Sequence, residues 1–419
     1  MKKNMKKDIL VMGFAMFAIF FGSGNLIFPP IIGLVSGEQV GWAIIGLALT
    51  GILFPMMALA SVGNVGYNLQ DMMKHINSWW HYLYMGLGLL VVIFGTIPRC
   101  GGVAFESGMQ GIFGELPFMA RIIFLAIFFA ISYYFAMNRS TVIDKVGNYL
   151  TPALLITLLA IVVLAIVNPI DTLHSSSIST AKESFLNGFF TGYNKMMLGI
   201  ILVGFTLLFV VYAGLAYLGA QGVNYYSLDV NATFLLTDLV KNLAGYEGSF
   251  ILAVAVILAC LTTAIGMIAT AGQWVEAWFK GKISYRQASL MITIAIFMIS
   301  CLGVSNVLKI SGPIFMILFP MSVVLTFLGL GKKWVPNDGA WKGAVWVAFI
   351  MSLFDALNLA VMTGLVNIDI SGLMNIINQI PLAKQGFAWL IPTILGYVIG
   401  AVIYKFKKKE SIAYEVWDN

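Results

Sequence analysis

The chain consists of long apolar stretches separated by short polar intervals. About eleven stretches reach the roughly 20 apolar residues that a transmembrane helix requires. The longest, such as "ALLITLLAIVVLAIV", lack the strict two-residue alternation of an outer-membrane strand, so the pattern predicts helices. The predicted spans are 9–34, 41–65, 80–104, 118–137, 147–167, 196–219, 249–272, 287–305, 308–330, 343–365 and 387–405.

The composition places these helices in a membrane. Of the 419 residues, 60% are hydrophobic and only 10% are charged, which leaves too little polar surface to cover a soluble globule of this size. A soluble enzyme is thereby excluded. The sequence also lacks the G-x-x-x-x-G-K-[ST] loop that a nucleotide-driven pump would use. The three cysteines show no paired spacing, so we expect neither disulfides nor a metal centre built on them.

The charged residues flank the spans, and the net charge of +6 therefore does not indicate a nucleic-acid surface. Lysines precede the first span at 2–7 and follow the last at 405–409, which predicts that both termini are cytoplasmic. The first apolar run is long and no small-x-small cleavage site follows it, so we expect an uncleaved first span. The basic intervals predicted to be cytoplasmic are 138–146, 273–286 and 331–342. The polar intervals predicted to be extracellular loops are 168–195 and 220–248.

The number of spans conflicts with the positions of the termini. Two cytoplasmic termini require an even number of crossings, and about eleven is odd. Both intervals beside 196–219 are predicted to be extracellular, so this segment alone breaks the alternation. We predict that 185–219 enters and leaves the membrane as a distorted pair of segments and not as one clean crossing.

The first span is interrupted near its midpoint by Gly22-Ser23-Gly24-Asn25 and then by Pro29-Pro30. In hydrocarbon an unpaired backbone N–H or C=O group costs several kcal/mol, so a break at this depth needs a partner. The half-helix after the break would present its N-terminal dipole to a carboxylate, and the carbonyls ending the half-helix before it would suit a cation. Close packing of another helix on the glycines, with a kink at Pro29, is the alternative.

Three further groups of residues are candidates for chemistry at membrane depth. Ala259, Thr262 and Thr263 are spaced i, i+3, i+4 and share one helix face, where the two hydroxyls can offer oxygen ligands to a small hard cation. The alternative is that each threonine bonds to a carbonyl of its own helix. Arg99 is either a functional charge or an interfacial one, and Glu106, about two turns further on, is a candidate gating or structural partner.

Several segments of the sequence resemble the bacterial branched-chain amino acid carriers, a family of cation symporters for leucine, isoleucine and valine. They are "GFAMFAIFFGSGNLIFPPIIGLVSGE" at 13–38, "PRCGGVAFESG" at 98–108, "DKVGNYLTP" at 144–152, "GSFILAVAVILACLTTAIGMI" at 248–268 and "PLAKQGFAWLIPT" at 381–393. The resemblance implies an all-α polytopic protein with the inverted-repeat, leucine-transporter-like (APC-type) fold. Within one transporter domain, 1–419, it implies a first repeat at 9–167, a second at 185–330 and two appended spans at 343–405.

The resemblance also implies a site at the break. A sodium ion would be held by the carbonyls of Ala18 and Phe21, facing Ala259, Thr262 and Thr263. The substrate carboxylate would be received by Gly22, Ser23 and Gly24, with Phe20 and Asn25 completing the substrate site. The expected ligands are leucine, isoleucine, valine and Na⁺, with no other cofactor and the lipid bilayer as surroundings.

The chain departs from the family pattern after "NGFFTGYN", at 187–194. It passes directly into "MMLGIILVGFTLLFVVYAGLAYLGA", which resembles the end of the seventh family span, so most of a broken sixth span and the following loop are missing. Two hypotheses follow. The chain is a sodium-coupled symporter that takes up branched-chain amino acids across the bacterial cytoplasmic membrane, or it is a remnant that keeps the fold without transporting.

Overall fold

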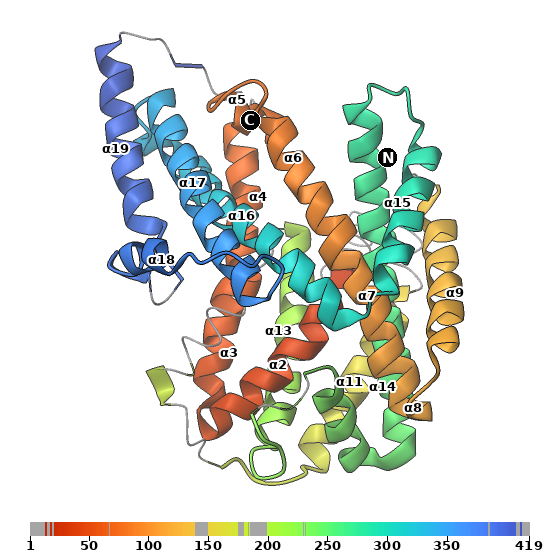
Figure 1. Cartoon of the computed structure of the whole chain (residues 1–419). Helices are drawn as coiled ribbons and strands as arrows, with labels where there is room; N and C mark the ends of the chain where they lie inside the picture. Colours follow the sequence, from red (N-terminus) through yellow and green to blue (C-terminus); the bar gives the residue numbers. More distant parts are fainter. Residues whose placement is uncertain are drawn as a thin grey trace, which may run out of the picture. The chain divides into compact units, whose positions relative to one another are not determined.

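The computed structural model describes residues 13–14, 17–18, 21–66, 68–138, 150–174, 180–182, 184, 199–228, 230, 232–383, 386–407 and 411–412. The regular elements in these ranges are all helical (Figure 1). Six helices of the described part are long and apolar enough to cross a membrane: Gly24–Gly51, Trp80–Phe113, Phe118–Ala136, Phe234–Trp278, Val304–Leu330 and Asp338–Met362. Shorter apolar helices are Thr151–Val167, Thr206–Ala220, Tyr285–Ser300 and Leu390–Phe406. The chain is therefore an all-α, multi-pass membrane protein, as predicted.

The chain forms two compact units. Unit 1 comprises Met1–Met56 and Thr96–Val304, and unit 2 comprises Met57–Gly95 and Ser305–Asn419. The inverted repeats at 9–167 and 185–330 stay a prediction, because several residues at the start of each lie outside the described part.

Unit 1 contains the elements around the predicted site. They are α2 (Ser23–Ser36), η1 (Gly37–Gln39), α3 (Val40–Ala48), the π-helical η2 (Leu49–Leu53), α7 (Ile97–Val103), the π-helical η4 (Ala104–Met109), α8 (Gln110–Phe113), α9 (Phe118–Ala136), α11 (Thr151–Val167), α13 (Gly199–Ala220), α14 (Ala232–Trp278) and α15 (Tyr285–Ser300).

Helix α2 differs from the prediction at both of its expected interruptions. It begins at Ser23, so the break lies at Phe21 and Gly22, slightly earlier than predicted. Pro29 and Pro30 lie inside the helix and do not end it. Proline removes a backbone donor, but its fixed φ is compatible with a helix. Close packing of α13 on this stretch supports the backbone there.

Glycines allow α2 and α13 to approach at backbone distance. A Cβ on Gly33 would lie 1.8 Å from the carbonyl oxygen of Ala216, and a Cβ on Gly219 would lie 1.9 Å from that of Pro30. Any larger residue would push the two helices apart. This contact fixes α2, and with it the break, against α13.

The direction of α13 bears on the predicted parity conflict. Val162 of α11 lies against Gly214 of α13, and further along both helices the Gln221 side chain donates to Ala165 O at 3.0 Å and accepts from Ile170 N at 2.9 Å. Contacts that advance together along both chains mean that α11 and α13 run parallel. The first part of the predicted pair 185–219, including 185–194, lies outside the described residues, so the pair stays a prediction.

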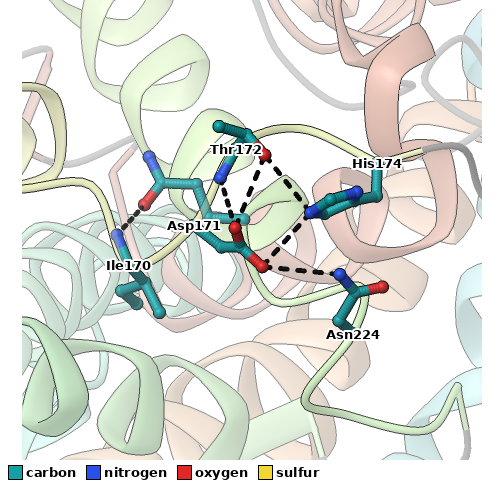
Figure 2. A network of polar contacts seen from close by, with 6 residues as sticks. Ile170, Asp171, Thr172, His174 and Asn224 are labelled. Carbon is teal, nitrogen blue, oxygen red and sulfur yellow. Dashed lines mark hydrogen bonds and ion pairs between the residues drawn. The ribbon is translucent and has the colours of Figure 1, made fainter.

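A network of polar contacts lies beyond the C-terminal ends of α11 and α13 (Figure 2). Asp171 accepts from the backbone N–H of Thr172 at 2.7 Å, pairs with His174 at 3.2 Å and accepts from Asn224 at 3.4 Å. These hydrogen bonds, that of the Thr172 N–H first, hold the pKa of Asp171 below its usual value. The network links the segment after α11 to the turn after α13.

The interval 220–248 was predicted to be an extracellular loop; its second half is helical, and its extracellular location stays a prediction. Helix α14 begins at Ala232 and is interrupted at Ala244 and Gly245, where Gly245 has φ +58. The arm before the interruption buries an apolar stripe of Leu235, Leu236, Leu239 and Val240. The surrounding charges mask this amphipathic pattern in the sequence.

Unit 2 contains most of α4 (Phe54–Val65), α5 (Leu69–Lys74), α6 (Trp80–Val91), the π-helical η3 (Val92–Thr96) up to Gly95, α16 (Val304–Leu330) from Ser305, η6 (Lys332–Trp334), α17 (Asp338–Met362), α18 (Ser371–Ile377) and α19 (Leu390–Phe406). Helices α17 and α19 lie side by side (Figure 1). They meet at glycines, since a Cβ on Gly343 would lie 1.9 Å from Gly396 O. Buried Asp338 contacts His75 Nδ1 at 2.8 Å and accepts from Ile412 N at 2.9 Å. The interval 331–342 and the C-terminal segment therefore lie at the same end of this unit, which is consistent with the prediction that both are cytoplasmic.

Candidate substrate and cation site

The break in the first span separates a half-helix from α2. Phe17 and Ala18 are helical, and Phe21 N still donates to Phe17 O at 2.7 Å. Gly22 is extended, with φ −107 and ψ −167, and α2 follows at once. Because the helical hydrogen-bond pattern stops at this point, the last carbonyls of the first half and the first N–H groups of the second half are available to other partners.

Two threonines of α14 face the carbonyls that end the first half-helix. Thr262 Oγ1 lies 3.1 Å from Ala18 O and 3.0 Å from Ala259 O, within donor distance of both carbonyls. Thr263 Oγ1 lies 3.3 Å from both Ala18 O and Phe21 O. The structure thus brings together all five residues that were predicted to hold the cation, and their oxygens converge from two helices.

The contacts of Thr263 differ from ordinary threonine packing in a membrane helix, whereas Thr262 bonds both to Ala18 O and to Ala259 O of its own helix. Thr270, seven residues further along α14, bonds at 2.9 Å to Gly266 O of its own helix. Thr263 instead reaches carbonyls of a different helix, more than two hundred positions away in the chain. Hydroxyl and carbonyl oxygens are the ligands that hard cations such as Na⁺ accept.

The cation side of the break is sealed from water. Ala18, Phe21 and Thr262 have no exposed surface, and Thr263 is 1% exposed. A Cβ on Gly22 would lie 3.0 Å from Thr263 Oγ1, which is tighter than nearly all real contacts. Glycine at this position is therefore what allows the backbone and the threonine to approach so closely.

The other side of the break carries a positive charge. A Cβ on Gly24, in the first turn of α2, would lie 2.9 Å from Nη2 of Arg99. Asn25 N donates to Gly22 O at 3.0 Å, and its side chain is partly buried. Phe20 and the side chain of Ser23, both predicted to contact the substrate, lie outside the described part.

Comparison with known proteins shows the family of the chain. The family model for "Branched-chain amino acid transport protein" matches residues 5–198 and 195–407. The chain belongs to the branched-chain amino acid transport protein family. It is 30% identical over 451 positions to the branched-chain amino acid permease BrnQ of Bacillus subtilis (strain 168), covering 98% of this chain and 100% of that relative. The family consists of transporters, so the chain is not an enzyme.

Solved structures place this member of the branched-chain amino acid transport protein family among transporters of the leucine-transporter-like fold. MhsT in complex with L-phenylalanine has a TM-score of 0.51 at 16% identity, covering 84% of this chain and 98% of that one. Mhp1, a nucleobase-cation-symport-1 family transporter, has a TM-score of 0.53 at 13% identity, covering 85% and 91%. At these identities the likeness shows the fold, which is the predicted one.

The comparison also bears on the segment that the chain lacks relative to its family. The two matched stretches meet at 195–198, where the sequence departs from the family pattern. The alignment with the Bacillus relative runs over 451 positions, although this chain has only 419 residues. The relative therefore carries residues that have no counterpart here.

Arg99 and Glu106 do not pair with each other in this family member. The carboxylate of Glu106 accepts from Arg121 of α9 at 3.1 Å. The Arg121 guanidinium also lies 5.3 Å from the centre of the Phe105 ring and beside Gly303, which has φ +84. Arg121 thus joins α9, η4 and the turn after α15, and the gating role of Arg99 and Glu106 stays a prediction.

Sequence reasoning missed Tyr212 of α13. It is 5% exposed, and its ring centre lies 6.1 Å from that of Phe21, which in turn stacks on Phe17 at 5.1 Å. Tyr212 therefore supports the residue whose carbonyl faces Thr263. An aromatic residue inside an apolar span carries no local signal of this role, because it depends on the α2–α13 crossing.

Proposed function

We propose that this chain is a secondary active transporter that takes up leucine, isoleucine and valine across the cytoplasmic membrane, coupled to the entry of Na⁺. The N-terminus is cytoplasmic in this proposal. Substrate and cation occupy the two sides of the break before α2, and one side of the site opens at a time.

The observation that carries the proposal is the convergence of Ala18 O and Phe21 O with the hydroxyls of Thr262 and Thr263. The carbonyls end a half-helix, where the dipole is negative, and the position is closed to water. A small cation is the ligand that this charge and these donor atoms favour. Family membership and the permease name of the Bacillus relative support the substrate class.

Sodium entry supplies sufficient work for accumulation. One positive charge moving down a potential of about 100 mV contributes roughly 2.3 kcal/mol, which corresponds to a substrate gradient of about 50-fold. An apolar pocket distinguishes side chains that differ by one methylene by only about 1–3 kcal/mol. Leucine, isoleucine and valine can therefore share one site.

A non-transporting remnant is the second candidate. It is favoured by the interruption of the family match at 195–198, since the missing segment belongs to the start of the predicted second repeat. Such a protein would keep the contacts between the first span and α14. It would bind ligand at most, without the alternation that moves substrate.

Uptake of labelled leucine into proteoliposomes separates the two candidates. An inward sodium gradient is compared with choline, with an inward proton gradient and with empty liposomes. The transporter proposal expects uptake that requires protein and sodium and that unlabelled isoleucine and valine inhibit. Leucine binding by the detergent-purified protein without uptake would favour the remnant. Uptake driven by protons alone would contradict the sodium coupling.

A further inference from the structure

Two cysteines that lie far apart in the sequence meet inside unit 1. Cys100 belongs to α7 and Cys260 to α14, and a hydrogen bond joins their side chains. Cys100 is 1% exposed and Cys260 has no exposed surface. The spacing of the cysteines along the chain gave no indication of this pair, because the contact depends on how the two helices pack.

The packing of α7 and η4 on α14 accounts for the contact. A Cβ on Gly108 would lie 3.0 Å from the side chain of Ile257. About one turn earlier in the chain, the backbone N–H of Ala104 donates to the sulfur of Cys260. The two segments therefore run antiparallel. Cys100 lies one further turn back on the same face, since residues four apart share a helix face, and this register sets the two thiols against each other.

A positive charge lies beside the two sulfurs. Arg99 directly precedes Cys100, and its guanidinium interacts electrostatically with both thiols. Arg99 retains exposed surface within the membrane-spanning helix Trp80–Phe113, so the neighbourhood of the pair is not fully closed. A buried negative charge is stable only when a partner compensates it, and here the guanidinium is that partner. The pair is therefore suited to a complex that carries negative charge.

Two facing thiols are a donor set for a soft cation that takes two ligands. Cu⁺ and Ag⁺ prefer sulfur to hydroxyl or carbonyl oxygen, and each accepts two thiolates in a linear arrangement. Binding replaces both S–H bonds by bonds from sulfur to the metal, and the two protons leave to water. The oxidation state of the metal and of the sulfurs does not change. The resulting complex carries one net negative charge, which the Arg99 guanidinium offsets.

We propose that Cys100 and Cys260 form a two-coordinate binding site for a soft monovalent cation, Cu⁺ or Ag⁺, between α7 and α14. The site is distinct from the proposed sodium site, whose ligands are hard oxygen atoms. Cys260 directly follows Ala259, so the bound ion would link α7 to α14 beside the sodium site. The inference goes beyond the proposed function, because binding of this ion requires neither leucine nor transport.

Competition with the coloured Cu⁺ chelator bicinchoninate measures binding of Cu⁺ to the purified full-length protein in oxygen-free buffer with ascorbate. We expect Cys100→Ser and Cys260→Ser each to bind Cu⁺ at least about 100-fold more weakly than the wild type, because each loses one of two thiolates. Cys301→Ser is the matched control, since Cys301 is a partly exposed cysteine in the turn after α15 and should not affect binding. Thr263→Val should also bind as the wild type does, because its hydroxyl is a ligand for hard cations. Equal binding by all four variants would overturn the site.

If the serine variants of the pair do not fold, proton release from the wild type gives the test. Binding at two thiols should release about two protons for the first Cu⁺ bound at neutral pH, whereas binding at methionine sulfurs releases none. The release is followed with a pH indicator in weakly buffered solution. Release of one proton or none, or a wild type that takes no Cu⁺ from the chelator, would overturn the site. Failure of the protein to bind leucine would overturn only the proposed function.

Discussion

Replacing Thr263 by valine removes one hydroxyl and adds a methyl group at nearly the same volume. That hydroxyl lies 3.3 Å from both Ala18 O and Phe21 O, in a position with almost no exposed surface. Contacts with a charged partner contribute about 1.5–3 kcal/mol, so loss of this ligand should raise the half-saturating sodium concentration about 10- to 100-fold. The buried carbonyl of Phe21 also loses its donor, which should lower the stability of the sodium-free protein by about 1–3 kcal/mol.

The assay is a sodium titration of leucine binding to the purified protein at a fixed leucine concentration. Thr270→Val is the matched control, because Thr270 lies on the same helix and bonds only within it, to Gly266 O, among the contacts described. We expect a shifted sodium titration for Thr263→Val and an unshifted one for Thr270→Val. The same sodium dependence in both variants would refute the cation site and return Thr263 to helix packing.

The remaining predictions concern the substrate side, the packing and the topology. Gly24→Val should abolish leucine binding while the protein still reaches the membrane fraction, because its side chain would occupy the place beside the guanidinium; normal binding would contradict this. Gly343→Leu should destabilise the protein by about 3 kcal/mol or more in a thermal unfolding assay, whereas Gly372→Leu, where nothing lies within 4 Å, should not. With the native cysteines replaced, a cysteine at position 241 should be labelled from outside the cell and one at position 282 should not. Labelling at 282 but not at 241 would contradict the predicted topology.

The helices could be predicted from the sequence because the length of an apolar stretch is a local property. Two details of the helices could not be predicted: the continuity of α2 through its prolines and the helical arm at the start of α14. The local pattern predicted an interruption of the helix at Pro29 and Pro30, but the helix continues through them because the close contact at Gly33 and Gly219 supports it. The arm of α14 before Gly245 was hidden because Asp238 and Lys241 interrupt a buried stripe that is only short. In both places tertiary packing decides what the local pattern leaves ambiguous.

The site shows the same division. Helical spacing alone places Ala259, Thr262 and Thr263 on one face, but only the family resemblance predicted which carbonyls that face would meet. The spacing of Arg99 and Glu106 left a pair between them open, and Glu106 instead contacts Arg121 from a helix that no spacing rule connects to it. Which side chains of distant segments contact each other depends on how the helices pack, and a single sequence does not contain that information directly.

The measurement that tests the central claim most directly is the reciprocal effect of substrate and cation on each other's binding. Labelled leucine is titrated with and without sodium, and labelled sodium is titrated with and without leucine, on the same purified protein. If both ligands occupy the two sides of one break, each must raise the affinity for the other by the same factor, and we expect that factor to exceed one. Leucine binding that is identical with and without sodium would contradict the account.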